Sequence, residues 1–332
     1  MPTILLSFNP AARALYYGDQ ALAGLRSLGE VRLHEQGKAL SGEALIAAAA
    51  GCQVIVSDRQ TPGPAELFAS SPVLAVFLRC AMDIRNVDVA AASAAGVLVT
   101  RASAGFGTAV AEWVLGVMID LGRGISRSVL AYRSGEQPAL RMGRELRGSR
   151  LGIIGYGHIG RHVGEMALAL GMPVSYSDPS VQDSNTAARR LPLDDLLADA
   201  DFVLCLAPAT PQTENLMDAA RFARMKPGAC FINAARGNLV DEAALLSALE
   251  SGHLAGCALD VGRAPDQMPT LALARHPLVI ATPHIGGLTP AAAEHQALET
   301  VAQLAELLRG GMPAGAVNAE QARRLATLSR SA

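Results

Sequence analysis

The first third of the chain alternates short apolar runs with stretches whose apolar residues recur at helical spacing. The apolar runs predict strands at residues 3–7, 31–34, 53–57, 74–79 and 97–100. The helical spacing between them predicts helices that include residues 19–28, 43–50 and 87–95. Strands that alternate with helices are typical of a parallel sheet covered by helices. A long helix is predicted next, from Thr108 to about Arg127.

A second series of apolar runs begins at Leu151. It predicts six strands, at residues 151–154, 174–176, 202–206, 230–233, 256–259 and 279–281. Helices fit between them, including one at residues 241–250, and this order matches a doubly wound nucleotide-binding fold. A last helix, at residues 290–308, has no strands of its own, so we expect it to pack on the first domain.

The chain is therefore predicted to form an α/β protein of two domains. The first is discontinuous and comprises residues 1–101 and 288–332, and the second comprises residues 102–287. Because the chain then crosses twice between the domains, we expect substrate to bind in the cleft that those crossings border.

A glycine motif at the start of the second series predicts dinucleotide binding. Gly155, Gly157 and Gly160 follow the strand at residues 151–154 and open a helical stretch. The first glycine permits a tight turn, the second lets the backbone approach a pyrophosphate, and the third lets the helix pack on the strand. Asp178 ends the next strand, where a carboxylate accepts hydrogen bonds from a ribose diol and repels a 2′-phosphate. The motif therefore favours NAD over NADP.

Composition limits the classes of protein to consider. Half of the residues are hydrophobic and 17% are charged, which is typical of a folded globular protein. The net charge of −2 gives no indication of nucleic acid or of an anionic membrane as partner. No uncharged apolar run reaches the ~20 residues of a membrane span, and the N-terminus lacks a signal-type segment. Five cysteines without a CxxC pair predict buried thiols and a cytoplasmic protein.

Three polar residues follow predicted strands of the second domain: Arg236, Asp260 and His284. Ligands of open α/β sheets bind at the carboxyl ends of strands, so these residues are candidates for a site. A guanidinium can bind a carboxylate through two hydrogen bonds, and an imidazole can exchange a proton near neutral pH. With a nicotinamide as hydride acceptor, they would suit the oxidation of a 2-hydroxy acid. Taken singly, each could instead be a surface charge, a structural histidine or a turn cap.

Several motifs together resemble one known family. They include Gly155-Tyr-Gly-His-Ile-Gly160, Asn233-Ala-Ala-Arg-Gly237 and Thr282-Pro-His-Ile-Gly-Gly287, with Ala109-Val-Ala-Glu112 in the long helix. These motifs and their order along the chain are similar to those of the D-isomer-specific 2-hydroxyacid dehydrogenases. The resemblance extends from about residue 50 to 310. The resemblance implies two Rossmann-like domains, the first a flavodoxin-like substrate-binding domain, NAD as cofactor, a small 2-hydroxy or 2-keto acid as substrate, and usually a homodimer.

The resemblance also implies roles for individual residues. Arg236 would bind the substrate carboxylate and polarise the carbonyl, His284 would be the general acid/base, and Asp260 would hold the nicotinamide carboxamide. The remaining cofactor contacts implied by the resemblance are His158 and Ile159 at the pyrophosphate, Pro208 and Thr213 along the cofactor, and Ala234 and Gly287 with Arg236 and His284 near the nicotinamide. We assign no metal site.

The chain departs from the family pattern after Asp260. The family carries a Glu there that pairs with the catalytic histidine, and here Pro265 stands at that position. Asp266 is the nearest carboxylate, one residue later. It either substitutes for the missing Glu through a shifted loop or is a solvated loop acid.

A second departure lies in the first domain, in the loop whose backbone holds the substrate carboxylate in this family. The family's glycines are absent from residues 79–88, although Asn86 and Asp88 keep the end of the pattern. The substrate loop here is formed by Ala81, Met82, Asp83 and Arg85.

The sequence favours an NAD-dependent 2-hydroxyacid dehydrogenase, acting as a 2-ketoacid reductase in the other direction. The main alternative is a binding protein that senses NAD(H), because corepressors of the C-terminal-binding-protein type share this fold. A methyltransferase with a similar glycine loop would explain neither Arg236 nor His284.

Overall fold

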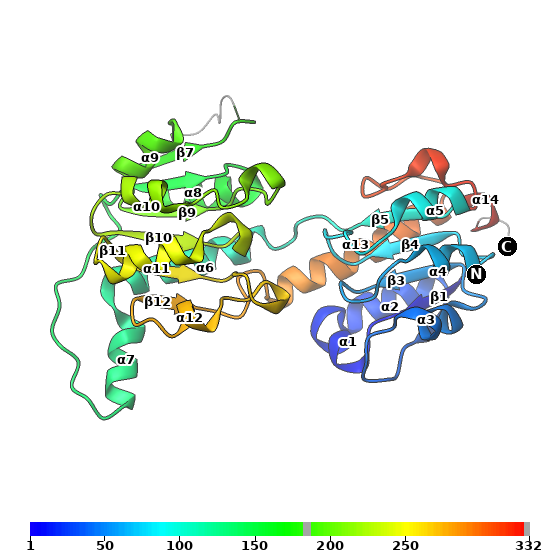
Figure 1. Ribbon diagram of the computed structural model, residues 1–332. Coiled ribbons are helices and arrows are strands. Elements are labelled where there is room, and N and C mark those ends of the chain that lie inside the picture. The colour runs from blue at the N-terminus through cyan, green and yellow to red at the C-terminus, as the bar shows by residue number, and fades with distance from the viewer. Residues whose placement is uncertain (182–186, 329–332) are drawn as a thin grey trace. The chain divides into compact units, whose positions relative to one another are not determined.

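The computed structural model describes residues 1–181 and 187–328, apart from the side chain of Asp266 (Figure 1). The chain divides into two compact units, Met1–Phe106 with Thr289–Ala332 and Gly107–Leu288. Each unit is built on a parallel sheet, and the discontinuous first unit confirms that part of the predicted fold class. In the described ranges, no helix has both the length and the apolar composition that crossing a membrane requires.

The first unit contains a five-stranded parallel sheet in the order β2-β1-β3-β4-β5. Its strands are β1 (Thr3–Leu6), β2 (Glu30–Leu33), β3 (Val54–Ser57), β4 (Val76–Arg79) and β5 (Leu98–Arg101). Its helices before the crossing are α1 (Pro10–Tyr16), α2 (Gly18–Leu28), α3 (Gly42–Ala49), α4 (Ala65–Ser70) and α5 (Val89–Ala95). After the second crossing come α13 (Pro290–Leu308), the 3-10 turn η4 (Ala319–Gln321) and α14 (Leu325–Leu328).

Two apolar cores cover the two faces of this sheet. Because side chains alternate along a strand, Val54 and Val56 pack in the core with α2 and α13, whereas Ile55 packs in the core with α3 and α4. Burial on both faces explains why the first three residues of β3 and of β4 are all apolar in the sequence.

Helix α13 completes the first unit, as its lack of strand partners predicted. Thr289 caps it by accepting a hydrogen bond from the Ala292 amide at 3.2 Å, and Pro290 occupies its first turn. The helix buries Leu304 in the core that it shares with α2. A buried hydrogen bond of 2.9 Å joins the Thr300 and Tyr17 hydroxyls, and burial raises the pKa of that tyrosine.

The second unit contains a seven-stranded parallel sheet in the order β12-β11-β10-β9-β6-β7-β8. Its strands are β6 (Leu151–Ile154), β7 (Val174–Ser177), β8 (Arg189–Arg190), β9 (Phe202–Cys205), β10 (Ala229–Asn233), β11 (Leu254–Leu259) and β12 (Val279–Ala281). Its helices are α6 (Gly107–Arg123), α7 (Ile125–Arg133), α8 (His158–Ala169), α9 (Leu193–Asp199), α10 (Ala219–Arg224), α11 (Glu242–Glu250) and α12 (Leu271–Ala274). The strand order reverses between β6 and β9, where ligands of doubly wound sheets bind.

Two sequence expectations for this unit were wrong. The sheet has a seventh strand, β8, because a pair of exposed arginines extends its edge without any apolar signal. The long helix predicted to about Arg127 ends at Arg123, because Gly124 adopts a left-handed backbone with φ 66° and a separate helix α7 follows.

We expect Leu304→Ala to lower the free energy of unfolding by about 2–5 kcal/mol, because it leaves a cavity in the core shared by α2 and α13. Glu294→Ala, at an exposed position of the same helix, serves as the control and should change it by less than about 0.5 kcal/mol. Urea unfolding of both variants measures the difference. Equal midpoints would contradict a packing role for α13.

Candidate functional site

The glycine motif forms a sharp turn between β6 and α8. Gly155 has φ 92°, and a Cβ there would lie 2.7 Å from the backbone nitrogen of Ala207. A Cβ on Gly160 would lie 2.5 Å from the Gly155 carbonyl oxygen. Any side chain at either position would therefore force the turn away from its neighbours.

Gly157 differs from these two glycines because it faces open space. Among the described residues, no atom beyond its immediate chain neighbours lies within 4 Å of the Cβ that a side chain would add, and its φ is −76°. It is the N-cap residue of α8, beside the exposed His158 and the half-buried Ile159. The amide groups of a helix N-terminus attract phosphate, so this turn fits the pyrophosphate of a dinucleotide.

Asp178 follows β7 and ties that strand to the glycine turn. Its Oδ2 accepts a hydrogen bond of 2.8 Å from the Tyr156 amide, and its Oδ1 accepts one of 2.8 Å from the Ser180 amide. This local role was not predicted from the sequence. An ionised carboxylate has about four acceptor positions, so it keeps capacity for the hydroxyls of a ribose.

Arg236 lies on a turn that starts where β10 ends. The buried side chain of Asn233 fixes this turn: its Nδ2 donates to the Arg236 carbonyl at 2.9 Å, and its Oδ1 accepts from the Ala235 amide at 3.0 Å. Arg236 is half-buried and precedes the 3-10 turn η2 (Gly237–Leu239). Asn233 was not among the predicted site residues, although an asparagine at a strand end is a signal for a turn held by its side chain.

Asp260 holds the loop that carries His284. Its buried carboxylate accepts hydrogen bonds from the Thr282 hydroxyl at 2.6 Å, the Ile285 amide at 2.8 Å and the Gly286 amide at 2.7 Å. His284 lies inside this loop and has φ 56°, a left-handed conformation that a non-glycine residue rarely adopts. The structure therefore gives Asp260 a role that the sequence did not predict, which is to fix the backbone on both sides of the histidine.

The three strand-end residues gather at one edge of the sheet. Arg236, Asp260 and His284 follow β10, β11 and β12, which are neighbours in the parallel sheet. Ala234 and Gly287 are also expected near the nicotinamide. Both are half-buried, Ala234 in the segment after β10 and Gly287 in the segment after β12. Among the described residues, no group of three His, Cys, Asp or Glu side chains could hold a metal ion.

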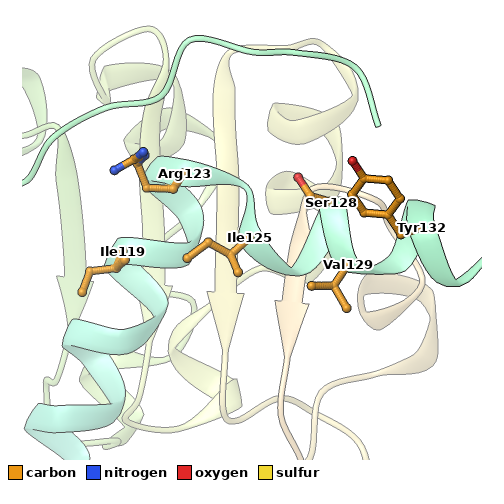
Figure 2. Close-up of a pocket in the computed structure, with 6 residues that line it drawn as sticks. All are labelled: Ile119, Arg123, Ile125, Ser128, Val129 and Tyr132. Atoms are coloured by element: carbon orange, nitrogen blue, oxygen red, sulfur yellow. The ribbon is translucent and has the colours of Figure 1, made fainter. Parts of the chain in front are cut away.

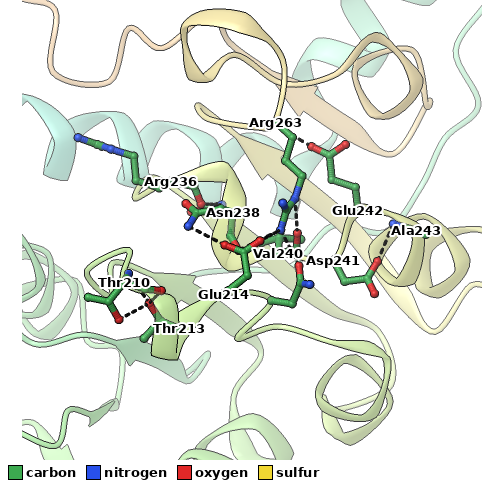
Figure 3. Close-up of polar contacts among 12 residues, drawn as sticks. Thr210, Thr213, Glu214, Arg236, Asn238, Val240, Asp241, Glu242, Ala243 and Arg263 are labelled. Atoms are coloured by element: carbon green, nitrogen blue, oxygen red, sulfur yellow. Dashed lines mark hydrogen bonds and ion pairs between the residues drawn. The ribbon is translucent and has the colours of Figure 1, made fainter. Parts of the chain in front are cut away.

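The segment expected to run along the cofactor is rigid at its centre. The Thr213 hydroxyl donates to the Pro208 carbonyl at 2.7 Å. It accepts from the Thr210 amide at 2.8 Å (Figure 3). The 3-10 turn η1 (Pro211–Thr213) is thereby closed by a capping box.

Asp266 lies in the 3-10 turn η3 (Pro265–Gln267), which confirms neither of its two possible roles. Its side chain is outside the described part of the structure. Its pairing with His284 therefore stays a prediction.

The loop expected to bind substrate in the first unit is held by a buried arginine that was not among the predicted site residues. Arg79 donates to the Asn86 side chain at 2.6 Å and to the Asp58 carbonyl. Burial lowers the pKa of Arg79 to about 10, so it remains charged at neutral pH. Beyond it, Ala81 is buried and Met82 is exposed. Asp83 and Arg85 form an ion pair at 2.6 Å.

Comparison with known proteins identifies the relatives of this chain. The family model "D-isomer specific 2-hydroxyacid dehydrogenase, NAD binding domain" matches residues 115–286. D-3-phosphoglycerate dehydrogenase of Rattus norvegicus is 35% identical over 286 residues, which cover 85% of this chain and 53% of that protein. D-3-phosphoglycerate dehydrogenase 2 of Saccharomyces cerevisiae is 37% identical over 247 residues, which cover 70% of this chain and 53% of that protein. The chain thus spans about half the length of the curated relatives it matches.

Solved structures are similar over almost the whole chain. The TT0316 protein from Thermus thermophilus is 31% identical with a TM-score of 0.83, covering 95% of this chain and 99% of that one. A putative D-isomer specific 2-hydroxyacid dehydrogenase from a Polaromonas species is 25% identical with a TM-score of 0.86, covering 96% and 99%. The family model and the curated relatives confirm the family resemblance, and the solved structures confirm the predicted fold. The family model identifies NAD as the cofactor of the second unit.

Two glycines of the turn should respond differently to alanine. Gly155→Ala should lower the free energy of unfolding of the second unit by about 1–3 kcal/mol, because φ 92° and the contact with Ala207 strain any side chain. Gly157→Ala should change it by less than about 0.5 kcal/mol. It should nevertheless weaken NADH binding by roughly tenfold, because the methyl group occupies the surface that the pyrophosphate approaches.

Thermal unfolding and NADH fluorescence titration of both variants test this contrast. Equal loss of stability in the two variants would show that Gly157 is a structural glycine as well.

Proposed function

The chain belongs to the D-isomer specific 2-hydroxyacid dehydrogenase family, and from this we propose that it transfers a hydride between NAD(H) and a 2-hydroxy or 2-keto acid. The observation that carries the proposal is the common edge of β10, β11 and β12, where Arg236 and the Asp260-held His284 stand. This edge belongs to the same sheet as the glycine turn that binds the dinucleotide.

Each strand-end residue has a role in this reaction. The Arg236 guanidinium binds the substrate carboxylate through two parallel hydrogen bonds, which orients the 2-carbonyl carbon. The His284 imidazolium donates its proton to the carbonyl oxygen during reduction and takes a proton from the hydroxyl during oxidation. NAD(H) supplies or accepts the hydride when bound. Asp260 uses three acceptor positions in the His284 loop, and the remaining one suits the nicotinamide carboxamide.

The other cofactor contacts follow the glycine turn. Gly157, His158 and Ile159 would hold the pyrophosphate at the start of α8. Asp178 would accept the ribose hydroxyls and so favour NADH over NADPH, because its charge repels a 2′-phosphate. We place Pro208 and Thr213 along the cofactor.

Asp266 is proposed to raise the proton affinity of His284. It is the acid within the loop 261–269, in which the family's Glu is absent. A carboxylate near an imidazole favours its protonated form by charge and by hydrogen bond.

Turnover tests the proposed function directly. NADH oxidation with a panel of 2-ketoacids should show activity on at least one of them, and the absence of any turnover would favour the NAD(H)-sensing alternative. Arg236→Lys should lower kcat/KM by about 100-fold, equivalent to about 2.7 kcal/mol, because an ammonium cannot bind both carboxylate oxygens in the fork geometry. NADH affinity should stay within about twofold.

Arg224→Lys is the matched control for this substitution, since Arg224 lies exposed on α10 and pairs with Asp194 at 3.3 Å. A similar loss of NADH affinity and of turnover in Arg236→Lys would assign Arg236 a structural role instead.

We also propose that the protein is a homodimer formed through α6, α7 and the segment that follows. Figure 2 shows a shallow apolar pocket at the junction of the two helices, lined by Ile119, Arg123, Ile125, Ser128, Val129 and Tyr132. Helix α7 buries none of its residues, and Leu140 and Met142 are fully exposed beyond it. Several exposed apolar side chains along one stretch of the chain are typical of an interface, and a second copy of the chain fits the family's usual assembly.

Leu140→Asp should shift the protein from dimer to monomer in sedimentation velocity, because it places a charge within the proposed apolar interface. Leu15→Asp is the matched control, since Leu15 is 59% exposed on α1 of the other unit. If Leu140→Asp and Leu15→Asp both keep the sedimentation coefficient of the native protein, the proposed interface is contradicted.

We place the protein in a reducing compartment such as the cytoplasm. All five cysteines are free and buried. Burial raises the pKa of Cys205 to about 12 and that of Cys230 to about 11, so these thiols stay protonated and unreactive.

A further inference from the structure

Arg263 lies in the loop 261–269 and joins three segments of the second unit (Figure 3). Its Nη2 lies 2.8 Å from Glu214 Oε1, 2.5 Å from Asn215 Oδ1 and 3.0 Å from the Asn238 carbonyl oxygen. Its Nε donates to the Val240 carbonyl at 3.1 Å. We infer that Arg263 is a positioning residue, which holds the turn carrying Arg236 in the geometry needed to bind the substrate carboxylate. This inference rests on the proposed function of Arg236.

The loop and the Arg236 turn are in direct backbone contact. A Cβ on Gly237 would lie only 2.0 Å from the carbonyl carbon of Gly262, so no side chain separates the two segments. Gly237 follows Arg236, and Gly262 precedes Arg263. Any displacement of the loop is therefore passed to the backbone next to Arg236.

Glu214 links Arg263 to the same turn a second time. While Oε1 accepts from Arg263, Oε2 accepts from Asn238 Nδ2 at 2.9 Å. The hydrogen bonds from Asn238 and Arg263 lower the pKa of Glu214, so the carboxylate is charged at neutral pH. Since the pKa is depressed in the folded protein, this link is complete above the ordinary Glu pKa and is lost as the pH falls through the folded value.

Glu242 fixes the far side of the loop. Its Oε1 accepts from the Arg263 amide at 3.1 Å, and its Oε2 accepts from the Thr270 hydroxyl at 2.8 Å. The backbone of Arg263 is thus held from α11 while its side chain reaches the Arg236 turn. Because both the backbone amide and the guanidinium of Arg263 are held, the residue has little freedom to move, as a positioning residue requires.

Arg263 acts through the turn and does not meet the substrate itself. In Figure 3 the Arg236 side chain extends away from the cluster around Arg263 and Glu214. The ion pair is partly exposed, with 35% of the Arg263 side chain and 44% of the Glu214 side chain accessible, so solvent screens it. Loss of Arg263 should therefore disturb the turn more than it lowers the stability of the whole unit.

Amide hydrogen exchange tests the local effect without any need for turnover. Arg263→Gln should speed exchange about tenfold in the paired segments 215–217 and 238–241, because it removes the bonds to Asn238 and Val240. The control, Arg224→Gln at an exposed position of α10, should exchange like the native protein. Native exchange rates in Arg263→Gln would overturn the inference.

A double-mutant cycle tests whether the effect passes through Arg236. In the native background, Arg263→Gln should lower kcat/KM by about tenfold, because a small misplacement of a binding group is costly, and should leave NADH affinity within about twofold. In the Arg236→Lys background, the same change should cost less than about twofold, because the geometry it protects is already lost.

An equal tenfold loss in both backgrounds would show that Arg263 acts independently of Arg236 and would overturn the inference. A native protein without turnover on any 2-ketoacid would count against the proposed function, and the exchange experiment would then decide the role of Arg263 alone.

Discussion

The candidate site depends on the hydrogen bonds that the buried carboxylate of Asp260 accepts from the His284 loop. Removing a charged carboxylate from water is costly unless hydrogen bonds replace the lost hydration, and three donors from one loop do so here. All three donors flank His284, so satisfying the charge also sets the path of the histidine's backbone. The same bonds hold a residue with φ 56°, a conformation that the loop would otherwise not keep.

The sheet brings the remaining parts of the site to this carboxylate. Parallel strands end at a common edge, and β10, β11 and β12 are neighbours in the order of the sheet. Residues far apart in the sequence, such as Arg236 and Asp260, therefore follow adjacent strands. Asn233 does for the Arg236 turn what Asp260 does for the histidine loop, since each uses a buried polar side chain to fix backbone that has no regular partner.

The sequence predicted most strands because a strand buried on both faces is an uninterrupted apolar run. It predicted the glycine turn because the spacing of its three glycines is specific to a turn in which the backbone approaches its neighbours closely, as Gly155 and Gly160 do. It could not predict β8, whose two arginines are exposed, or the end of α6, where one glycine changes the backbone locally. Residues such as Arg263 escaped because a polar side chain that bonds to distant carbonyls leaves no periodic pattern in the sequence.

The loop after Asp260 lacks the glutamate that pairs with the catalytic histidine in the family. Where the family carries an acid paired with the histidine, this chain has Pro265, yet the course of the loop is fixed by the backbone contact of Gly237 with Gly262 and by Arg263. The backbone on both sides of His284 is held by Asp260. A carboxylate beside the imidazole would add to this a higher proton affinity of the histidine, which is the role proposed for Asp266.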